Sequence, residues 1–117
     1  MLPGICHAAS VRIPVKVFVL HNNVLGMVNQ WQRLFFGGRE SQSIVKDLVD
    51  FPAMVKAMGL EGIKVTDPKK LNSVVKAALK SKGSVLVDVA IPNDENVFPM
   101  VPGGKHLDQM ILQDTLD

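Results

Sequence analysis

Hydrophobic and polar positions follow two different periods along this chain. Three short runs are almost continuously apolar, and they lie at residues 15–20, 62–65 and 84–91. Runs of this length, rich in β-branched residues, are typical of parallel strands that are covered on both faces. We therefore predict three buried strands, separated by segments of another kind.

The segments between these runs repeat their apolar residues at three- and four-residue spacing, which indicates helices. The predicted helices lie at residues 25–36, at residues 51–58, and from Asp67-Pro68 to just before Gly83. Asp50 is expected to cap the second helix, and Gly59 to end it. The apolar stripe of the third helix consists of Leu71, Val74, Val75, Ala78 and Leu79.

This order of strand, helix, helix, strand, helix, strand and tail predicts an α/β fold. Right-handed crossovers would give a parallel sheet of about three strands with helices on both faces, which makes three layers. The sequence shows no internal repeat and no low-complexity linker. We therefore expect a single domain over residues 1–117.

Composition excludes several classes of function. The net charge is +2 and the basic residues are scattered, so nucleic-acid binding has no support. No apolar run is long enough to span a bilayer, and we expect no membrane partner. The single cysteine, Cys6, cannot form an internal disulfide, which favours a reducing, cytoplasmic location. Hydrophobic residues make up 47% of the chain, so some apolar side chains either fill a core or face a partner.

The candidate chemistry follows the first strand. In open parallel sheets, ligands bind beyond the carboxyl ends of the strands, where His21, Asn22 and Asn23 stand. By themselves the two asparagines are also ordinary turn formers. Gly26 opens the next helix, and helix N-termini favour anions. The same glycine is equally consistent with a plain helix start.

Other polar and aromatic residues have both structural and functional interpretations. Met27 and Trp31 lie four residues apart on one helical face, which usually means core packing, although a tryptophan beside Gly37-Gly38 is hard to bury. Asp88 interrupts an apolar strand and needs a hydrogen bond or an uncovered face, so we interpret it as structural. His7 and His106 have no partners at zinc-type spacing, and we predict no zinc site.

Several motifs occur together and carry a family resemblance. The segment from Ile13 to Phe36 includes Leu25-Gly26-Met27-Val28 and Gln30-Trp31-Gln32, and the tail reads Pro99-Met100-Val101-Pro102-Gly103. At this separation the motifs are specific, and further matches cover nearly the whole chain. The sequence resembles the C-terminal, thiamine-diphosphate-binding domain of acetohydroxyacid synthase, also called acetolactate synthase.

The resemblance implies a thiamine-diphosphate- and Mg²⁺-dependent transferase of branched-chain amino acid biosynthesis. Such an enzyme decarboxylates pyruvate and joins the two-carbon unit to a second 2-ketoacid. Its catalytic subunit has three domains, whereas 117 residues accommodate one. The chain therefore resembles a fragment, with a partial thiamine-diphosphate-binding fold. The family's Gly-Asp-Gly motif and activating glutamate are not in this sequence, so we expect no catalytic residue here and no turnover by this chain alone.

The resemblance also implies roles for single residues. Asn22 would bind Mg²⁺ through its side chain and Val24 through its backbone carbonyl. Val24, Gly26 and Met27 would contact the cofactor, and Trp31 would shape the substrate pocket. His21 replaces the first asparagine of the family pattern, which indicates relaxed function rather than a new general base. If the alignment instead contains a one-residue deletion, Asn23 takes the metal.

Two further expectations concern the rest of the molecule. Pro3 and Gly4 interrupt a segment that is helical in the family, so we expect a frayed or redirected N-terminus. The missing N-terminal portion or a complementing subunit would be a partner, and the exposed edge of a narrow sheet favours a homo-oligomer. Two hypotheses remain: a fragment of a thiamine-dependent enzyme, or a stand-alone binding or interaction module derived from that fold.

Overall fold

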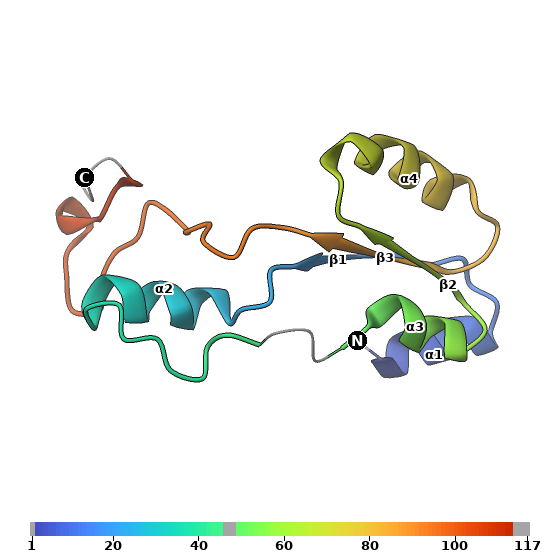
Figure 1. The fold of residues 1–117 in the computed structure, drawn as a ribbon, viewed down its shortest axis with the longest axis horizontal. Helices are drawn as coiled ribbons and strands as arrows, with labels where there is room; N and C mark the ends of the chain where they lie inside the picture. The colour runs from blue at the N-terminus through green and yellow to red at the C-terminus, as the bar shows by residue number, and fades with distance from the viewer. Residues whose placement is uncertain (1, 46–48, 114–117) are drawn as a thin grey trace. The chain divides into compact units, whose positions relative to one another are not determined.

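The structure, a computed structural model, describes residues 2–45 and 49–113. Figure 1 shows the order of its elements, and they are α1 (Leu2–Ser10), β1 (Lys16–His21), α2 (Gly26–Phe35), α3 (Phe51–Ala57), β2 (Glu61–Val65), α4 (Pro68–Lys80), β3 (Val85–Ala90) and the 3₁₀ helix η1 (Leu107–Gln109). The chain forms two compact units. Unit 1 comprises Met1–Asn23 and Val45–Pro92, and unit 2 comprises Val24–Ile44 and Asn93–Asp117.

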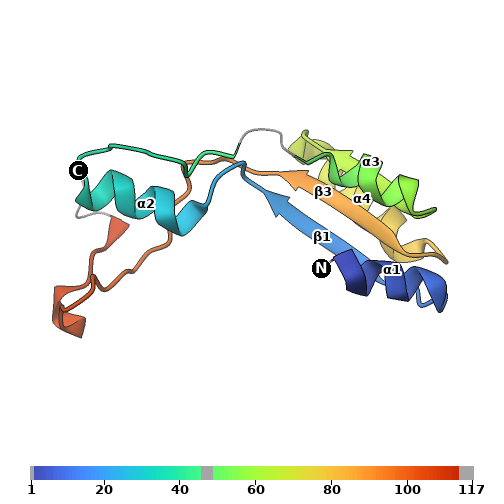
Figure 2. The same ribbon diagram turned by 90° about the horizontal axis from the view of Figure 1, so that it is seen from below.

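Unit 1 is built on a parallel sheet with the strand order β1-β3-β2. The central strand β3 pairs on both sides, so that Val87 lies opposite Phe18 of β1 and Ile63 of β2. Figure 1 shows α4 on one face of this sheet and α1 and α3 on the other, and Figure 2 looks onto the face with α1 and α3. The predicted α/β fold with a three-stranded parallel sheet is confirmed.

The side chains of β3 divide the core between the two faces. Val85, Val87 and Val89 point to the α4 face, where they pack with Val65 and Ala78. Leu86 points to the other face and packs with Ile5 of α1 and Val55 of α3. Five of the six residues of β3 are buried, as its continuous apolar run predicts.

The helix boundaries of unit 1 have local causes. The Asp50 carboxylate accepts a hydrogen bond from the Ala53 N–H at 2.9 Å, and Asp67 accepts one from the Lys69 N–H at 3.0 Å. Both aspartates thus satisfy a backbone donor in a first turn. Gly59 follows α3 with a φ of +76°, a conformation that glycine adopts without strain. The cap and the terminator predicted for this helix are confirmed.

The N-terminal segment forms a regular helix. The expectation that Pro3 and Gly4 fray or redirect it is wrong, because α1 spans Leu2–Ser10. Pro3 lies in the first turn, where its missing N–H would have had no partner in the helix. Ile5 and Ala8 are each only 7% exposed, so that burial of one helix face offsets the weak propensity of glycine and proline.

One residue of the predicted stripe on α4 is exposed. Leu71 and Val74 pack against the core and Ala78 is 1% exposed, but Leu79 is 62% exposed. Each residue turns the helix by about 100°, so Leu79 lies at the margin of the face centred on Ala78. No helix among residues 2–45 and 49–113 is long and apolar enough to cross a membrane.

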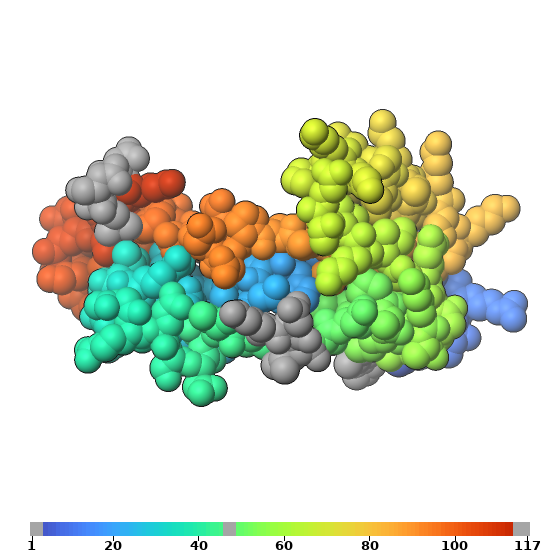
Figure 3. All heavy atoms as spheres, viewed as in Figure 1, coloured from blue at the N-terminus to red at the C-terminus, as the bar shows by residue number. Residues whose placement is uncertain are grey.

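Unit 2 consists of α2, the segment that follows it, and the C-terminal tail. An antiparallel bridge joins Val24 to Ile44, and a second joins Met100 to Ile111. Gly37 and Gly38 follow α2 with φ values of +61° and +69°, which confirms them as the end of that helix. Figure 3 shows the atoms of α2, in cyan, next to those of the tail, in orange and red.

Candidate functional site

The candidate site begins at the carboxyl end of β1. His21 is the last residue of the strand rather than the first residue after it, and Asn22 and Asn23 form the turn. Asn23 has a φ of +57°, in the left-handed region that asparagine tolerates better than most residues. The turn is held on both sides, because the Ile91 N–H donates to the His21 carbonyl at 3.1 Å and the Val45 N–H donates to the Asn23 carbonyl at 2.8 Å.

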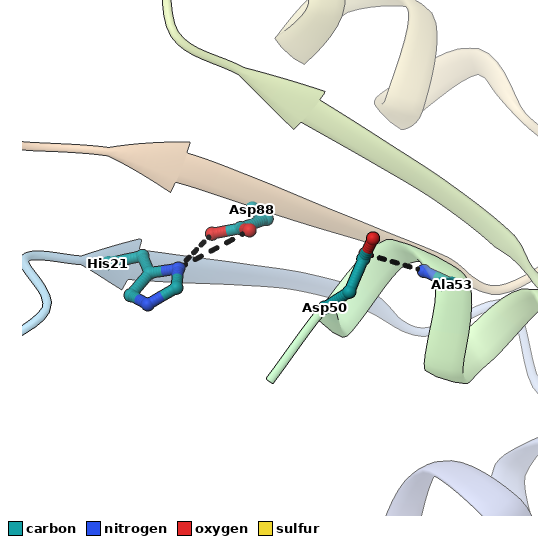
Figure 4. A network of polar contacts seen from close by, with 4 residues as sticks. All are labelled: His21, Asp50, Ala53 and Asp88. Atoms are coloured by element: carbon teal, nitrogen blue, oxygen red, sulfur yellow. Dashed lines mark hydrogen bonds and ion pairs between the residues drawn. The ribbon is translucent and has the colours of Figure 1, made fainter. Parts of the chain in front are cut away.

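A buried carboxylate lies beside the end of β1. Asp88, in the middle of β3, is 1% exposed. Its two oxygens lie 3.1 and 3.4 Å from Nδ1 of His21. Figure 4 draws both contacts as dashed lines. An ionised carboxylate only accepts hydrogen bonds, so beside an ionised Asp88 the donor of this bond is the Nδ1–H of His21. Of the two alternatives predicted for Asp88, a hydrogen bond or an uncovered face, the structure shows the hydrogen bond.

The imidazole of His21 also packs on an aromatic ring. The centroids of His21 and Phe51 are 5.3 Å apart and their planes are inclined by 78°, an edge-to-face arrangement. Phe51 is the first residue of α3, and its neighbour Asp50 caps that helix, as the close view in Figure 4 shows. The His21 side chain therefore contacts both β3 and α3.

The turn has one oxygen that suits a cation. Oδ1 of Asn23 is buried and has no hydrogen-bond partner among the described residues. Amide and backbone carbonyl oxygens are hard ligands of the kind that Mg²⁺ takes. Within residues 2–45 and 49–113, however, no three His, Cys, Asp or Glu side chains gather at one place that could hold a metal ion. The donors at the turn fit part of a magnesium site, and a carboxylate would have to come from elsewhere.

The N-terminus of α2 offers backbone donors. Gly26 is the first residue of the helix, and the Leu25 side chain before it makes no capping hydrogen bond. The Leu25 N–H donates to the Ser43 carbonyl at 2.8 Å, which fixes the entry into the helix. The first N–H groups of a helix without a side-chain cap are suited to an anion such as a diphosphate.

The apolar side chains of α2 are largely exposed. Met27 is 47% exposed and Trp31 is 51% exposed, so the interpretation of these two residues as core packing is wrong for this chain. Val28 and Phe35 are 48% and 45% exposed. Trp31 instead borders a cleft in unit 2 that the tail completes; its lining residues are Trp31, Phe35, Phe36, Met100, Val101, Pro102 and Gly103.

The interior of unit 2 contains polar residues that the sequence did not single out. Asn29 is 3% exposed, Gln30 1% and Ser43 0%. The Gln30 side chain binds the backbone of Val97 in both directions, accepting from its N–H at 2.9 Å and donating to its carbonyl at 3.1 Å. Asn29 donates to the Ser43 hydroxyl at 3.1 Å. These bonds attach α2 to the tail and to the segment that follows it.

Gln32 makes a second set of bonds to that segment. Its amide donates to the Ser41 carbonyl at 2.8 Å and accepts from the Ser43 hydroxyl at 2.7 Å. The motif Gln30-Trp31-Gln32 thus places two structural amides on either side of an exposed indole. The available sequence signal was the group of three uncharged polar residues at positions 29, 30 and 32, but a polar side chain usually indicates the solvent side of a helix.

The predicted site residues belong to both units. Asn22 belongs to unit 1, whereas Val24, Gly26, Met27 and Trp31 belong to unit 2. Within unit 2 these four lie on or directly before α2, and Met27 and Trp31 are both on its exposed side. Because the proposed metal ligands Asn22 and Val24 are divided between the units, their joint binding of a cation stays a prediction.

Comparison with known proteins gives a consistent result. Residues 1–89 match the family described as thiamine pyrophosphate enzyme, C-terminal TPP binding domain. The chain is 41% identical over 104 residues to the mitochondrial acetolactate synthase of Schizosaccharomyces pombe, covering 89% of this chain and 15% of that protein. It is 39% identical over 111 residues to the large subunit of acetolactate synthase isozyme 3 of Escherichia coli, covering 92% of this chain and 19% of that protein.

A solved structure shares the fold. The thiamine diphosphate-dependent 4-hydroxybenzoylformate decarboxylase of Rhodococcus jostii RHA1 matches with a TM-score of 0.69 and 24% identity, over 79% of this chain and 17% of that chain. This likeness concerns the fold alone. The chain therefore spans less than a fifth of the length of each of these three proteins.

Proposed function

The chain belongs to the thiamine pyrophosphate enzymes, of which it contains the C-terminal cofactor-binding domain, and from this premise we propose that it supplies part of the cofactor site of an acetolactate synthase. The observation that carries the proposal is the turn after β1, where Asn22 and Asn23 directly follow a parallel strand. The amide oxygen that is buried without a partner among the described residues is that of Asn23, the metal ligand in the alternative alignment. The similarity of the chain to acetolactate synthases supports the choice within the family.

The residues of this chain would bind and orient the cofactor. Thiamine diphosphate, when bound with Mg²⁺, supplies the electron sink for decarboxylating a 2-ketoacid such as pyruvate. Asn22 would offer its side-chain oxygen to Mg²⁺ and Val24 its carbonyl. Gly26 would let the diphosphate approach the helix N-terminus, where N–H groups attract anions. Met27 would lie against the thiamine, and Trp31 would shape the pocket of the acceptor ketoacid.

This chain is proposed to be inactive by itself. Mg²⁺ is normally held by one or two carboxylates together with phosphate oxygens, and the turn contributes amide and carbonyl oxygens. The carboxylate and the activating glutamate would come from the missing N-terminal portion or from a complementing subunit. Assembly into a homo-oligomer, a cytoplasmic location and a role in branched-chain amino acid biosynthesis belong to the same proposal.

The test is a titration with Mg²⁺ and thiamine diphosphate that follows the fluorescence of Trp31, the single tryptophan. The proposal predicts a saturable change that requires both components. A flat response from a folded sample contradicts it and favours the stand-alone, non-catalytic module.

Two variants identify the metal ligand. Asn22→Ala abolishes the response if Asn22 binds the cation. Asn23→Gly removes the competing amide but keeps the positive φ, which glycine adopts freely. Loss of binding in the glycine variant alone would assign the metal to Asn23, the alternative in which the buried Oδ1 is the ligand.

The alternative function is a binding or interaction module without catalysis. The observation that favours it is the exposure of Met27, Trp31 and Phe35 on α2, which presents an apolar surface in unit 2. A reading frame for a Gly-Asp-Gly motif upstream in the source DNA would argue against this alternative, and its absence would argue for it.

A further inference from the structure

Asp88 occupies a position that is costly for a carboxylate. It lies in the central strand at 1% exposure, on the face of the sheet where Leu86 packs with apolar residues of α1 and α3. A buried charge without a partner is strongly unfavourable, because the interior replaces none of its hydration. Its partner is the imidazole of His21, whose Nδ1 lies 3.1 Å away. A hydrophobic residue would fill this position without needing a partner.

The register explains why the partner is His21. Asp88 lies opposite Val19 in β1, and His21 is the next residue on the same face, one pleat nearer the carboxyl end. On the other side of β3, Asp88 lies opposite Lys64, which is exposed. The buried carboxylate therefore holds the last side chain of β1, immediately before the asparagine turn.

Three contacts converge on His21. Its Nδ1–H donates to Asp88, its carbonyl accepts from the Ile91 N–H at 3.1 Å, and its ring packs edge-to-face with Phe51. Side chain and backbone of this residue are both restrained. On the far side of the turn, the Asn23 carbonyl accepts from the Val45 N–H at 2.8 Å. Asn22 thus lies between two fixed residues.

We propose that His21 and Asp88 are a positioning pair, which holds the Asn22–Asn23 turn in the conformation that presents an amide oxygen to the cation. This inference rests on the proposed function for the nature of the ligand. Like the outer partners of metal ligands, the pair acts by fixing the segment that carries the ligand. His21 takes no part in the chemistry and touches no substrate.

The first test needs no metal. In the full chain, amide hydrogen exchange is measured by NMR at Ile91 and Val45, whose N–H groups bond to the two sides of the turn, with the Val85 N–H, bonded to the Val15 carbonyl at the start of β1, as internal reference. His21→Leu removes the donor to Asp88 and should raise exchange at Ile91 and Val45 about tenfold, the equivalent of one hydrogen bond to a charged group. Exchange at Val85 should change little.

A second variant separates the effect of the lost hydrogen bond from the effect of a changed side-chain size. His21→Asn retains a side-chain donor and should keep exchange at Ile91 and Val45 within about threefold of the original, because an amide can still bond to the carboxylate. Lys64 lies opposite Asp88 in the other neighbouring strand, β2, so Lys64→Gln is the matched control. It should leave hydrogen exchange at both amides unchanged. Unchanged exchange in His21→Leu, or an equal rise at Val85, would overturn the proposal, since either result denies a local effect on the turn.

The second test measures affinity for Mg²⁺ in the presence of thiamine diphosphate. His21→Leu should weaken binding about 10- to 100-fold, as loss of an outer partner does at other metal sites, and His21→Asn should restore it. The double variant His21→Leu/Asp88→Leu removes both polar partners and should recover stability but not affinity. If the double variant recovers affinity, the pair is not needed to position the ligand, and the proposal is overturned.

The two tests separate the inference from its premise. A flat titration of the unmodified chain contradicts the proposed function. The exchange measurement then decides by itself whether the pair fixes the turn.

Discussion

The helix α3 passes closely over Gly62 of β2. A Cβ atom at this position would lie 2.5 Å from the Pro52 carbonyl oxygen and 2.8 Å from a methyl carbon of Val55. Because the first contact is with backbone, the helix itself would have to move away from the sheet. The absence of a side chain here sets the distance between α3 and β2.

Replacing this glycine should therefore destabilise the fold. Gly62→Ala is expected to lower the free energy of unfolding by about 1–3 kcal/mol, the usual cost of overpacking, as measured by urea denaturation. Gly83→Ala is the control, because a Cβ at Gly83 would meet no atom within 4 Å and its backbone is not left-handed. Equal stability of the two variants would contradict the close approach of α3.

The partner of a buried polar residue depends on strand order. The sequence predicted that Asp88 either makes a hydrogen bond or lies on an uncovered face, because a carboxylate in a continuous apolar run has to be satisfied. Its donor, His21, lies 67 residues earlier. That pairing follows from the position of β3 beside β1 and from the parallel register. The residues next to Asp88 in the sequence indicate neither of these. Hence the sequence predicted the requirement and the structure supplied the partner.

Among the elements, α2 departs most from its sequence pattern. Apolar spacing correctly predicted a helix at this place, because the period is a property of the helix itself. Which side is covered depends on the segments that pack against it. In unit 2 these segments bring the backbone of Val97 and the serines 41 and 43, which bond to Gln30 and Gln32. The covered side is consequently polar, contrary to the usual pattern.

Gln30 should be the main attachment of the tail to α2. Gln30→Leu removes both hydrogen bonds to the Val97 backbone, each of which contributes about 0.5–1.5 kcal/mol, because Val97 is exposed and water can replace the lost partner. Limited proteolysis is expected to cut residues 93–113 faster in this variant. Val28→Ala on the same helix, at an exposed position, should leave the cleavage rate unchanged. Equal cleavage of both variants would show that the tail is held by other contacts.

At the scale of the whole molecule, the α/β fold could be predicted from the alternation of strand-type and helix-type hydrophobic patterns along the chain. Each segment shows its own pattern, and right-handed crossovers between parallel strands restrict the topology. The division into two compact units was not predicted, because no linker composition marks the boundaries at Asn23 and Pro92. The helix α1 was missed for a related reason: proline and glycine were weighed by type, whereas their place in the first turn decides their effect.

The outer edge of β1 faces no other strand in the described sheet. The carbonyls of Val15 and His21 bond toward β3, so those of Phe18 and Leu20 point to the open edge. Phe18 is 39% exposed and Leu20 is 68% exposed, which adds apolar surface to unpaired backbone. Such an edge is a template for pairing with another chain.

Self-association should therefore depend on this edge. Leu20→Lys places a charge there and is expected to shift the chain toward monomer in analytical ultracentrifugation. Leu79→Lys, which changes an equally exposed leucine on α4, is the matched control and should leave the distribution as it was. A similar shift in both variants would mean that net charge, rather than the edge, governs association.

The polar interior of unit 2 has a thermodynamic consequence. Unfolding raises the heat capacity because apolar surface becomes hydrated, while newly exposed polar surface lowers it. Among the described residues of unit 2, those that are buried are Asn29, Gln30 and Ser43, whereas unit 1 buries a valine-rich core. The heat-capacity change of unfolding, measured by calorimetry on this chain, should therefore fall below the ordinary value of about 12–15 cal/mol/K per residue. The stability of unit 2 would then follow a nearly straight line with temperature, and cooling would strengthen it where a hydrocarbon interior begins to weaken.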